Sequence, residues 1–185
     1  MKPCFGGLGL LLLLAGASPS AEAQRFSDKD VLAPAYPSPE SVVDQMLSLA
    51  QVRPGEMVYD LGCGDGRIVI AAAQKFKARA VGIEIRRDIY EHTLAHVASL
   101  GLADQVKIVQ GNALNYDLSP ADVVTLYLLT SSNERLKPAL LKYLKPSARV
   151  VSHDFEIRGW KPVSTSKMMV EGRPHMIYLY RMDAR

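Results

Sequence analysis

Residues 58–66 read VYDLGCGDG, a short apolar strand that ends at Asp60 and is followed by three glycines at alternate positions. An alanine-rich run with helical character, residues 68–73, comes directly afterwards. Glycine lets the backbone turn tightly and approach a ligand closely, and the first N–H groups of a helix are free to bind polar groups. The stretch therefore predicts a nucleotide-type cofactor loop at the carboxyl end of a strand.

The spacing of the glycines separates this loop from the one that binds dinucleotides. The dinucleotide pattern is G-x-G-x-x-G, but here the third glycine, Gly66, comes one residue early. Arg67 stands where that pattern requires its last glycine. The spacing therefore argues against a dinucleotide cofactor.

Two further strands end in residues suited to a cofactor. The strand at 80–83 ends in Glu84, at the place where the two hydroxyls of a ribose need an acceptor. The strand at 106–110 leads into Gly111 and Asn112. Three elements able to contact a cofactor thus follow one another along the chain, each at the carboxyl end of a strand.

The rest of the chain alternates between helices and strands. Ser38 is expected to cap a helix that begins at Pro39, and a fourth strand is expected at 121–128. Two helical pieces split by Pro138 lead to a fifth strand at 149–153. Segments in the range 166–181 have the pattern of a terminal hairpin. The prediction is an α/β fold with a doubly wound, mostly parallel seven-stranded sheet and a C-terminal antiparallel hairpin.

The composition is that of one folded domain. The chain has 185 residues, 48% of them hydrophobic, and a formal net charge of +3. This length is sufficient to bury a core, and the ordinary charge content argues against disorder. The basic residues are scattered, so no nucleic-acid partner is expected.

The first 23 residues have the features of a secretory signal. Lys2 precedes an apolar run too short for a comfortable membrane span, and Ala21-Glu22-Ala23 resembles a cleavage site. The expected organisation is a signal peptide at 1–23, a lead-in at 24–37 and a catalytic domain at 38–185. The domain would be exported or periplasmic after cleavage, with no stable membrane span, or membrane-anchored without cleavage. Cleavage would leave Cys63 as the only cysteine, so no internal disulfide is expected.

Several motifs together resemble class I S-adenosylmethionine-dependent methyltransferases, whose sheet is Rossmann-like. The resemblance covers roughly residues 38–181 and is nearest to small bacterial relatives of the ATP synthase c-subunit lysine methyltransferase family. It rests on DLGCGDGRIV at 60–69, LYLL at 126–129, LKPAL at 136–140, RVVS at 149–152 and WKP at 160–162.

The resemblance implies S-adenosyl-L-methionine as cofactor and a protein substrate with an accessible lysine. Asn112 stands where these enzymes commonly have an acid, and its amide oxygen could accept from the adenine amine. Thr130 and Ser147 replace a proline and a glycine that are common in the bacterial relatives. The cofactor-binding residues expected on this basis are Asp60, Gly62, Gly64, Asp65, Glu84 and Asn112.

The expected catalytic residues are Tyr127 and Asp154, at the ends of the fourth and fifth strands. The Tyr127 ring could face the methyl group while its hydroxyl orients an amine, and Asp154 could accept from a substrate ammonium. Each also has a structural interpretation, as a core aromatic and as a partner of nearby backbone. No metal is expected, because His92 and His96 share a helix face without an evident third ligand.

Three functions remain open from the sequence alone. The first is a protein-lysine N-methyltransferase, which the resemblance favours. The second is a methyltransferase acting on O, N or S of a small molecule, although no inserted lid that would enclose such a substrate is evident. The third is a module that binds S-adenosylmethionine without catalysis.

Overall fold

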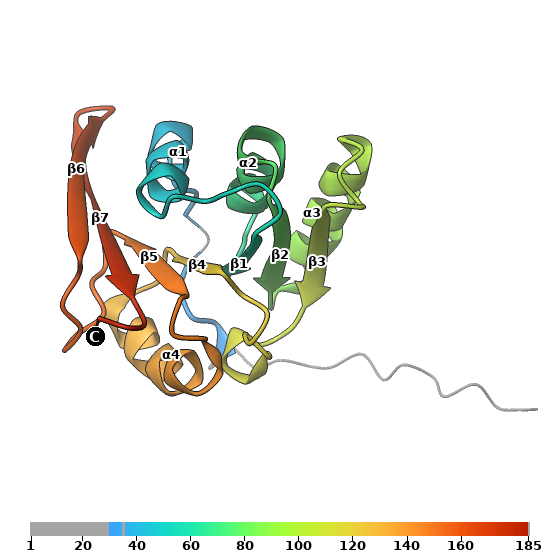
Figure 1. The fold of residues 1–185 in the computed structure, drawn as a ribbon. Helices are drawn as coiled ribbons and strands as arrows, with labels where there is room; N and C mark the ends of the chain where they lie inside the picture. The colour runs from blue at the N-terminus through green and yellow to red at the C-terminus, as the bar shows by residue number, and fades with distance from the viewer. Residues whose placement is uncertain (1–29, 35, 185) are drawn as a thin grey trace, which may run out of the picture.

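The computed structural model describes residues 30–34 and 36–184. A seven-stranded sheet with the strand order β3-β2-β1-β4-β5-β7-β6 forms its centre (Figure 1). The strands are β1 Met57–Leu61, β2 Arg79–Glu84, β3 Val106–Gln110, β4 Val123–Leu126, β5 Arg149–His153, β6 Ser164–Val170 and β7 Arg173–Arg181. The helices are α1 Glu40–Leu49, α2 Arg67–Phe76, α3 Arg87–Ser99, the short 3₁₀ helix η2 Ala113–Asn115, and α4 Thr130–Tyr143.

The direction of the strands agrees with the predicted fold. Strands β1 to β5 pair in parallel, and β7 pairs antiparallel with both β5 and β6. Helices α1, α2 and α3 lie on one face of the sheet and α4 lies on the other (Figure 1). The expected doubly wound α/β fold with a terminal hairpin is therefore confirmed.

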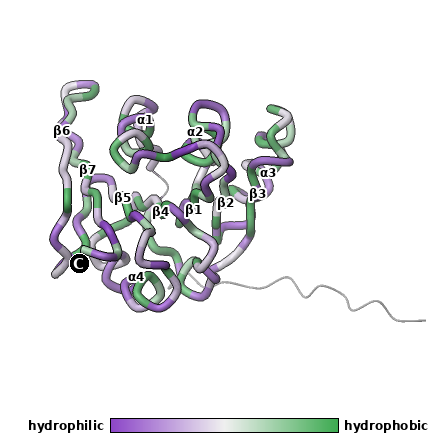
Figure 2. Tube along the Cα trace, viewed as in Figure 1, coloured by the Kyte–Doolittle hydropathy of each residue, from purple (hydrophilic) through white to green (hydrophobic). Residues whose placement is uncertain are grey.

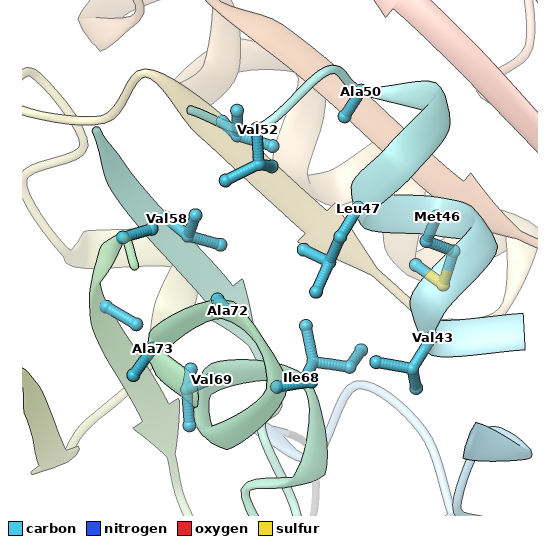
Figure 3. Packing of buried hydrophobic residues seen from close by; sticks show 14 of the residues in the cluster. Val43, Met46, Leu47, Ala50, Val52, Val58, Ile68, Val69, Ala72 and Ala73 are labelled. Atoms are coloured by element: carbon cyan, nitrogen blue, oxygen red, sulfur yellow. The ribbon is translucent and has the colours of Figure 1, made fainter. Parts of the chain in front are cut away.

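Each face of the sheet has its own apolar core. Val43, Met46 and Leu47 of α1 pack with Ile68 and other residues of α2 on one face, as Figure 3 shows. On the other face, buried leucines of α4 pack against β4 and β5. Figure 2 shows hydrophobic residues interspersed with hydrophilic ones along the helices, as expected when one side of a helix is buried.

The helix after β4 differs from the prediction. The two pieces expected on either side of Pro138 form one continuous helix, α4. Proline removes one N–H from the helix ladder, so the carbonyl of Glu134 loses its intrahelical donor. Leu136 and Leu140, on either side of the proline, are fully buried against the sheet. Their packing outweighs the lost hydrogen bond, which the local pattern alone could not reveal.

The start of α1 also differs from the prediction. Pro39, and not Ser38, is the N-cap residue, and no side chain caps the helix. The Ser38 hydroxyl is instead hydrogen-bonded to Nδ1 of His153 at 2.8 Å. A contact between distant parts of the chain has therefore replaced the local cap.

The C-terminal hairpin closes through a two-residue turn. Glu171 and Gly172 have φ values of +51° and +75°, the left-handed pair expected of a type I′ turn. Among the described residues, no helix is long and apolar enough to cross a bilayer. The predicted signal peptide at 1–23 lies outside the described residues and stays a prediction, and half of the lead-in, residues 24–29 and 35, lies outside them as well.

Candidate functional site

A cavity of about 430 Å³ lies where β1, β2 and β4 end. This volume is within the usual range for cofactor pockets, and the site lies outside the carboxyl ends of a parallel sheet, where ligands bind in such folds. The lining includes Asp60, Gly62, Gly64, Asp65, Glu84 and Tyr127. Six of the eight residues expected from the sequence are therefore brought together here.

The glycine loop requires its glycines for conformational reasons. Gly62, Gly64 and Gly66 have φ values of +81°, +52° and +80°, which side-chain-bearing residues rarely adopt. A Cβ at Gly66 would lie 2.7 Å from the Thr93 methyl group, and one at Gly64 would meet open space. The Thr93 hydroxyl donates to the Gly64 carbonyl at 2.7 Å, so α3 holds the loop in place.

Glu84 joins the end of β2 to the glycine loop. Its buried carboxylate accepts from the backbone N–H of Gly64 at 3.0 Å and from that of Arg86 at 2.8 Å. A carboxylate oxygen has a second lone pair, so the same group can accept from the hydroxyls of a ribose. The position fits the role expected from the sequence.

Asp60 is a buried acid at the end of β1. Burial raises its pKa to about 7, while the Thr125 hydroxyl, which donates to Oδ1 at 2.6 Å, acts in the opposite direction. The negative charges of Asp65 and Glu84 make smaller contributions to the same raised value. A positively charged ligand in this cavity would favour the ionised form of Asp60, and S-adenosylmethionine is such a ligand.

Asp65 and Arg67 connect the loop to the lead-in. Burial alone would raise the pKa of Asp65, but hydrogen bonds from Arg67 bring it below its ordinary value. The Arg67 guanidinium bonds Asp65 and also donates to the Ser38 carbonyl at 2.7 Å. Arg67, which stands in the position of a glycine in dinucleotide loops, thus anchors the segment before α1.

Asn112 does not occupy the position expected of it. Its neighbours Gly111 and Ala113 line the cavity, but its Oδ1 accepts from the Leu114 N–H at 2.9 Å and caps η2. Its Nδ2 donates to Asp30 Oδ1 at 3.2 Å. One lone pair of the amide oxygen expected to accept from adenine therefore holds the backbone of η2, and Asn112 is not among the described residues that line the cavity.

The lead-in supplies one wall of the cavity, which the sequence reasoning missed. Asp30, Leu32 and Tyr36 belong to the lining, and the Ser132 hydroxyl of α4 holds the Leu32 carbonyl. No pattern in the sequence links this segment to the sheet, because its partners lie 82 and 100 residues away. The cavity thus has an additional acid, Asp30, beside Asn112.

Tyr127 lies just beyond the end of β4 and lines the cavity. Its ring stacks on that of His153 with centroids 3.9 Å apart, and Phe155 lies at 6.3 Å. The Tyr127 hydroxyl also lies near the Arg173 guanidinium and is the first cause of the raised pKa of Arg173. The Tyr127 ring is thus held by aromatic stacking at the edge of the cavity.

The expectation that Asp154 is catalytic is not matched by its position, since it is absent from the lining formed by the described residues. Asp154 has a φ of +58°, and this turn directs its carboxylate toward β7. Oδ1 accepts from the Met176 N–H at 2.9 Å, and Oδ2 accepts from Arg173 at 2.8 Å. Next to it, burial lowers the pKa of His153 to about 4, so this imidazole is neutral near pH 7.

Comparison with known proteins places this site in a family. The family model of the ANTKMT methyltransferase domain matches residues 60–164. A protein-lysine N-methyltransferase of Saccharolobus islandicus is 49% identical over 148 residues, which is 80% of this chain and 92% of that protein. The adenine nucleotide translocase lysine N-methyltransferase of Mus musculus is 35% identical over 122 residues, 66% of this chain and 53% of that protein.

A solved structure shows the same fold with a ligand related to the cofactor. It is a crystal structure described as an RNA methyltransferase of Salinibacter ruber in complex with S-adenosyl-L-homocysteine. The two chains are 43% identical and superpose with a TM-score of 0.75. The match covers 81% of this chain and 95% of the Salinibacter ruber chain. The predictions of a methyltransferase and of S-adenosyl-L-methionine as cofactor are confirmed. The chain belongs to the ANTKMT methyltransferase family, within the class I S-adenosylmethionine-dependent enzymes.

Proposed function

We propose that this enzyme transfers the methyl group of S-adenosyl-L-methionine to the side-chain amine of a lysine in a protein substrate. The observation that carries the proposal is the 49% identity over 92% of a protein-lysine N-methyltransferase. The mouse relative is also a lysine N-methyltransferase, so the two relatives share this acceptor chemistry.

The residues of the cavity divide into a donor side and an acceptor side. Glu84 and the N–H groups of the glycine loop would hold the cofactor, and the Asp60 carboxylate would balance its positive charge. The cofactor supplies a methyl group that is already activated by a positively charged sulfur. Tyr127 would orient the amine in line with that methyl group, and alignment of this kind contributes about 7–11 kcal/mol of barrier reduction.

The charge of the cavity supports a cationic acceptor. Its lining contains five carboxylates against two arginines, Arg67 and Arg86. These arginines pair with Asp65 and Asp88, and Asp60 and Glu84 add two further, buried carboxylates. A lysine side chain approaches as a cation that this field attracts, and it would lose one proton to water before its nitrogen attacks the methyl group, whereas the phosphates of RNA are repelled.

RNA methylation is the second candidate function, because the similar Salinibacter ruber protein is described as an RNA methyltransferase. The two candidates separate in one experiment. The protein is incubated with S-adenosylmethionine labelled in its methyl group and with host extract, divided into untreated, ribonuclease-treated and protease-treated portions. We expect the label to resist ribonuclease, to be lost from the macromolecular fraction with protease and to yield methyl-lysine on hydrolysis.

Label that disappears with ribonuclease would overturn the proposal in favour of RNA. Label confined to the small-molecule fraction would replace it with a small-molecule acceptor, and cofactor binding without transfer would indicate a non-catalytic module. Glu84→Gln provides the matched negative control, because it changes the donor side without touching the acceptor side.

A further inference from the structure

Beside the end of β5, the chain buries two imidazoles and a carboxylate against one another. His153 is the last residue of β5 and is completely buried, Asp154 follows it, and His175 lies in the antiparallel neighbour β7. Their side chains approach through His153 Nε2, His175 Nδ1 and Asp154 Oδ2, which all lie within 4.8 Å of one another. This cluster lies outside the cofactor cavity, and the methyl transfer described above does not require it.

Two of the three distances among these atoms match those between metal ligands. His153 Nε2 and His175 Nδ1 are 2.8 Å apart. Asp154 Oδ2 lies 3.4 Å from the first and 3.6 Å from the second. In a tetrahedral zinc site with bonds of about 2.0–2.1 Å, two ligand atoms are separated by about 3.3 Å. The two distances from Asp154 are those of such a site, and the two imidazole nitrogens would move apart by about 0.5 Å to complete it.

We propose that His153, Asp154 and His175 bind one divalent transition-metal ion, with Zn²⁺ as the best match. Nitrogen and carboxylate oxygen donors suit Zn²⁺, and three protein ligands leave one tetrahedral position for a water molecule. The proposal does not rest on the identity of the methyl acceptor.

Two of the three ligands are already oriented by a second hydrogen bond. Nδ1 of His153 is joined to the Ser38 hydroxyl at 2.8 Å, and Asp154 Oδ1 accepts from the Met176 N–H at 2.9 Å. Partners of this type fix the tautomer and the direction of a metal ligand. They also account for Ser38, whose hydroxyl bonds His153 instead of capping α1.

The alternative is a histidine pair held only by its own hydrogen bond. At 2.8 Å, one proton lies between His153 Nε2 and His175 Nδ1. Metal binding would displace this proton, because both nitrogens must then present a lone pair to the ion. The two states therefore differ in whether the protein takes up an ion, which can be measured directly.

Arg173 is the group that competes with the ion. Its guanidinium lies 2.8 Å from Asp154 Oδ2, but its side chain is 61% exposed and can turn to solvent. Replacing it with glutamine removes a positive charge next to the proposed site. Arg173→Gln is therefore expected to bind the metal more tightly than the wild type, by about tenfold.

The ion would act as a support for the acceptor side of the cavity. The His153 ring stacks on Tyr127 at 3.9 Å, so fixing His153 also fixes the aromatic residue at the edge of the cavity. The same ion would link β5 to β7 through His153 and His175. Its role is thus positional, and no step of methyl transfer passes through it.

The test is a metal titration of the whole protein after dialysis against a chelator. We expect calorimetry with Zn²⁺ to give one ion per chain, and Co²⁺ to give the visible absorption of a tetrahedral complex. His175→Asn and Asp154→Asn are expected to weaken Zn²⁺ binding by about 100-fold or more. The matched control is His96→Asn, which removes an exposed histidine of α3 and should leave the affinity unchanged.

Circular dichroism and S-adenosylhomocysteine binding would establish that each variant is folded. If the folded wild-type protein takes up no stoichiometric Zn²⁺, the proposal is overturned. His153 and His175 are then a pair held only by their own hydrogen bond. Equal affinity in the wild type, His175→Asn and Asp154→Asn would also overturn it, because the ion would then bind elsewhere. If His175→Asn does not fold, the other two variants still test the proposal. Asp154→Asn must weaken Zn²⁺ binding, and Arg173→Gln must strengthen it.

Discussion

The carboxylate of Glu84 accepts a hydrogen bond from the backbone N–H of Gly64 at 3.0 Å. This bond ties the acid at the end of β2 to the loop at the end of β1, so the two cofactor-binding features of the sequence form one surface. Arg86 donates to the other oxygen of the same carboxylate at 2.8 Å. The geometry of Glu84 therefore depends on its having two acceptor oxygens.

Glu84→Gln is expected to lower the affinity for S-adenosylmethionine. Glutamine has one acceptor oxygen, so its NH₂ group would face one of the two backbone donors. Losing a charged hydrogen bond costs about 1.5–3 kcal/mol, which corresponds to roughly 10–100-fold in affinity. Calorimetry with S-adenosylhomocysteine measures this directly, with Asp88→Asn as the control for loss of an exposed acid in the same lining. Wild-type affinity in Glu84→Gln would contradict its place in the cofactor site.

Cofactor binding is expected to strengthen as the pH rises through about 7. The pKa of Asp60 is raised to about 7 by burial, so the group is largely protonated below that pH and carries no charge to offset the cofactor. A cationic ligand favours the ionised form, and binding near pH 7 should therefore release a proton. Calorimetry in buffers with different ionisation enthalpies counts that proton. Asp60→Asn should flatten the pH dependence, and an unchanged profile would assign it to another group.

The same acid makes a separate prediction for the stability of the free protein. The folded pKa of Asp60, about 7, is above the ordinary value of 3.8, so the folded state holds its proton more tightly than the unfolded state does. Its contribution to stability is fully present below about pH 4 and is lost as the pH rises through about 7. Asp60→Asn has no proton to lose and should gain stability relative to the wild type between pH 5 and about 8. Urea unfolding across this range measures the difference.

The elements that local patterns describe were predictable. The glycine loop is recognisable because alternate glycines between a strand and a helix have few other uses, and Glu84 is recognisable because it ends the next strand. Both signals lie within about thirty residues of one another. Such features depend on backbone conformation and strand order, which the sequence pattern carries directly.

The contacts that the sequence did not reveal join distant segments. Ser38 has the residue type and position of a helix cap, but its hydroxyl contacts His153, 115 residues away. Asn112 likewise contacts Asp30, 82 residues away, in a lead-in with no periodic pattern. Asp154 follows a strand as a catalytic acid would, yet its positive φ turns it toward β7. In each case tertiary packing chose between partners that a local pattern leaves equivalent.

Gly66→Ala is expected to destabilise the fold more than Gly101→Ala. Both glycines have a left-handed φ, at +80° and +68°, so both substitutions carry the same kind of backbone strain, about 1–2 kcal/mol. Only Gly66 has a neighbour in the way, since an added Cβ would lie 2.7 Å from the Thr93 methyl group. At Gly101 the added carbon meets open space. Urea unfolding measures the loss of stability in each variant, and the difference between the two losses is the cost of the steric contact. Equal losses would show that α3 moves to accommodate the extra carbon.

Tyr127→Phe separates the contribution of the Tyr127 ring from that of its hydroxyl. Phenylalanine keeps the ring that stacks on His153 but removes the hydroxyl that raises the pKa of Arg173. If the hydroxyl orients the acceptor amine, kcat should fall by about tenfold or more, while cofactor affinity stays within about twofold. Tyr127→Leu, which also loses the stacking, should lower kcat further and reduce thermal stability. Single-turnover methyl transfer and S-adenosylhomocysteine binding on the same preparations measure both quantities. A wild-type rate in Tyr127→Phe together with a defect in Tyr127→Leu would make Tyr127 a packing residue, because the ring alone would then account for its effect.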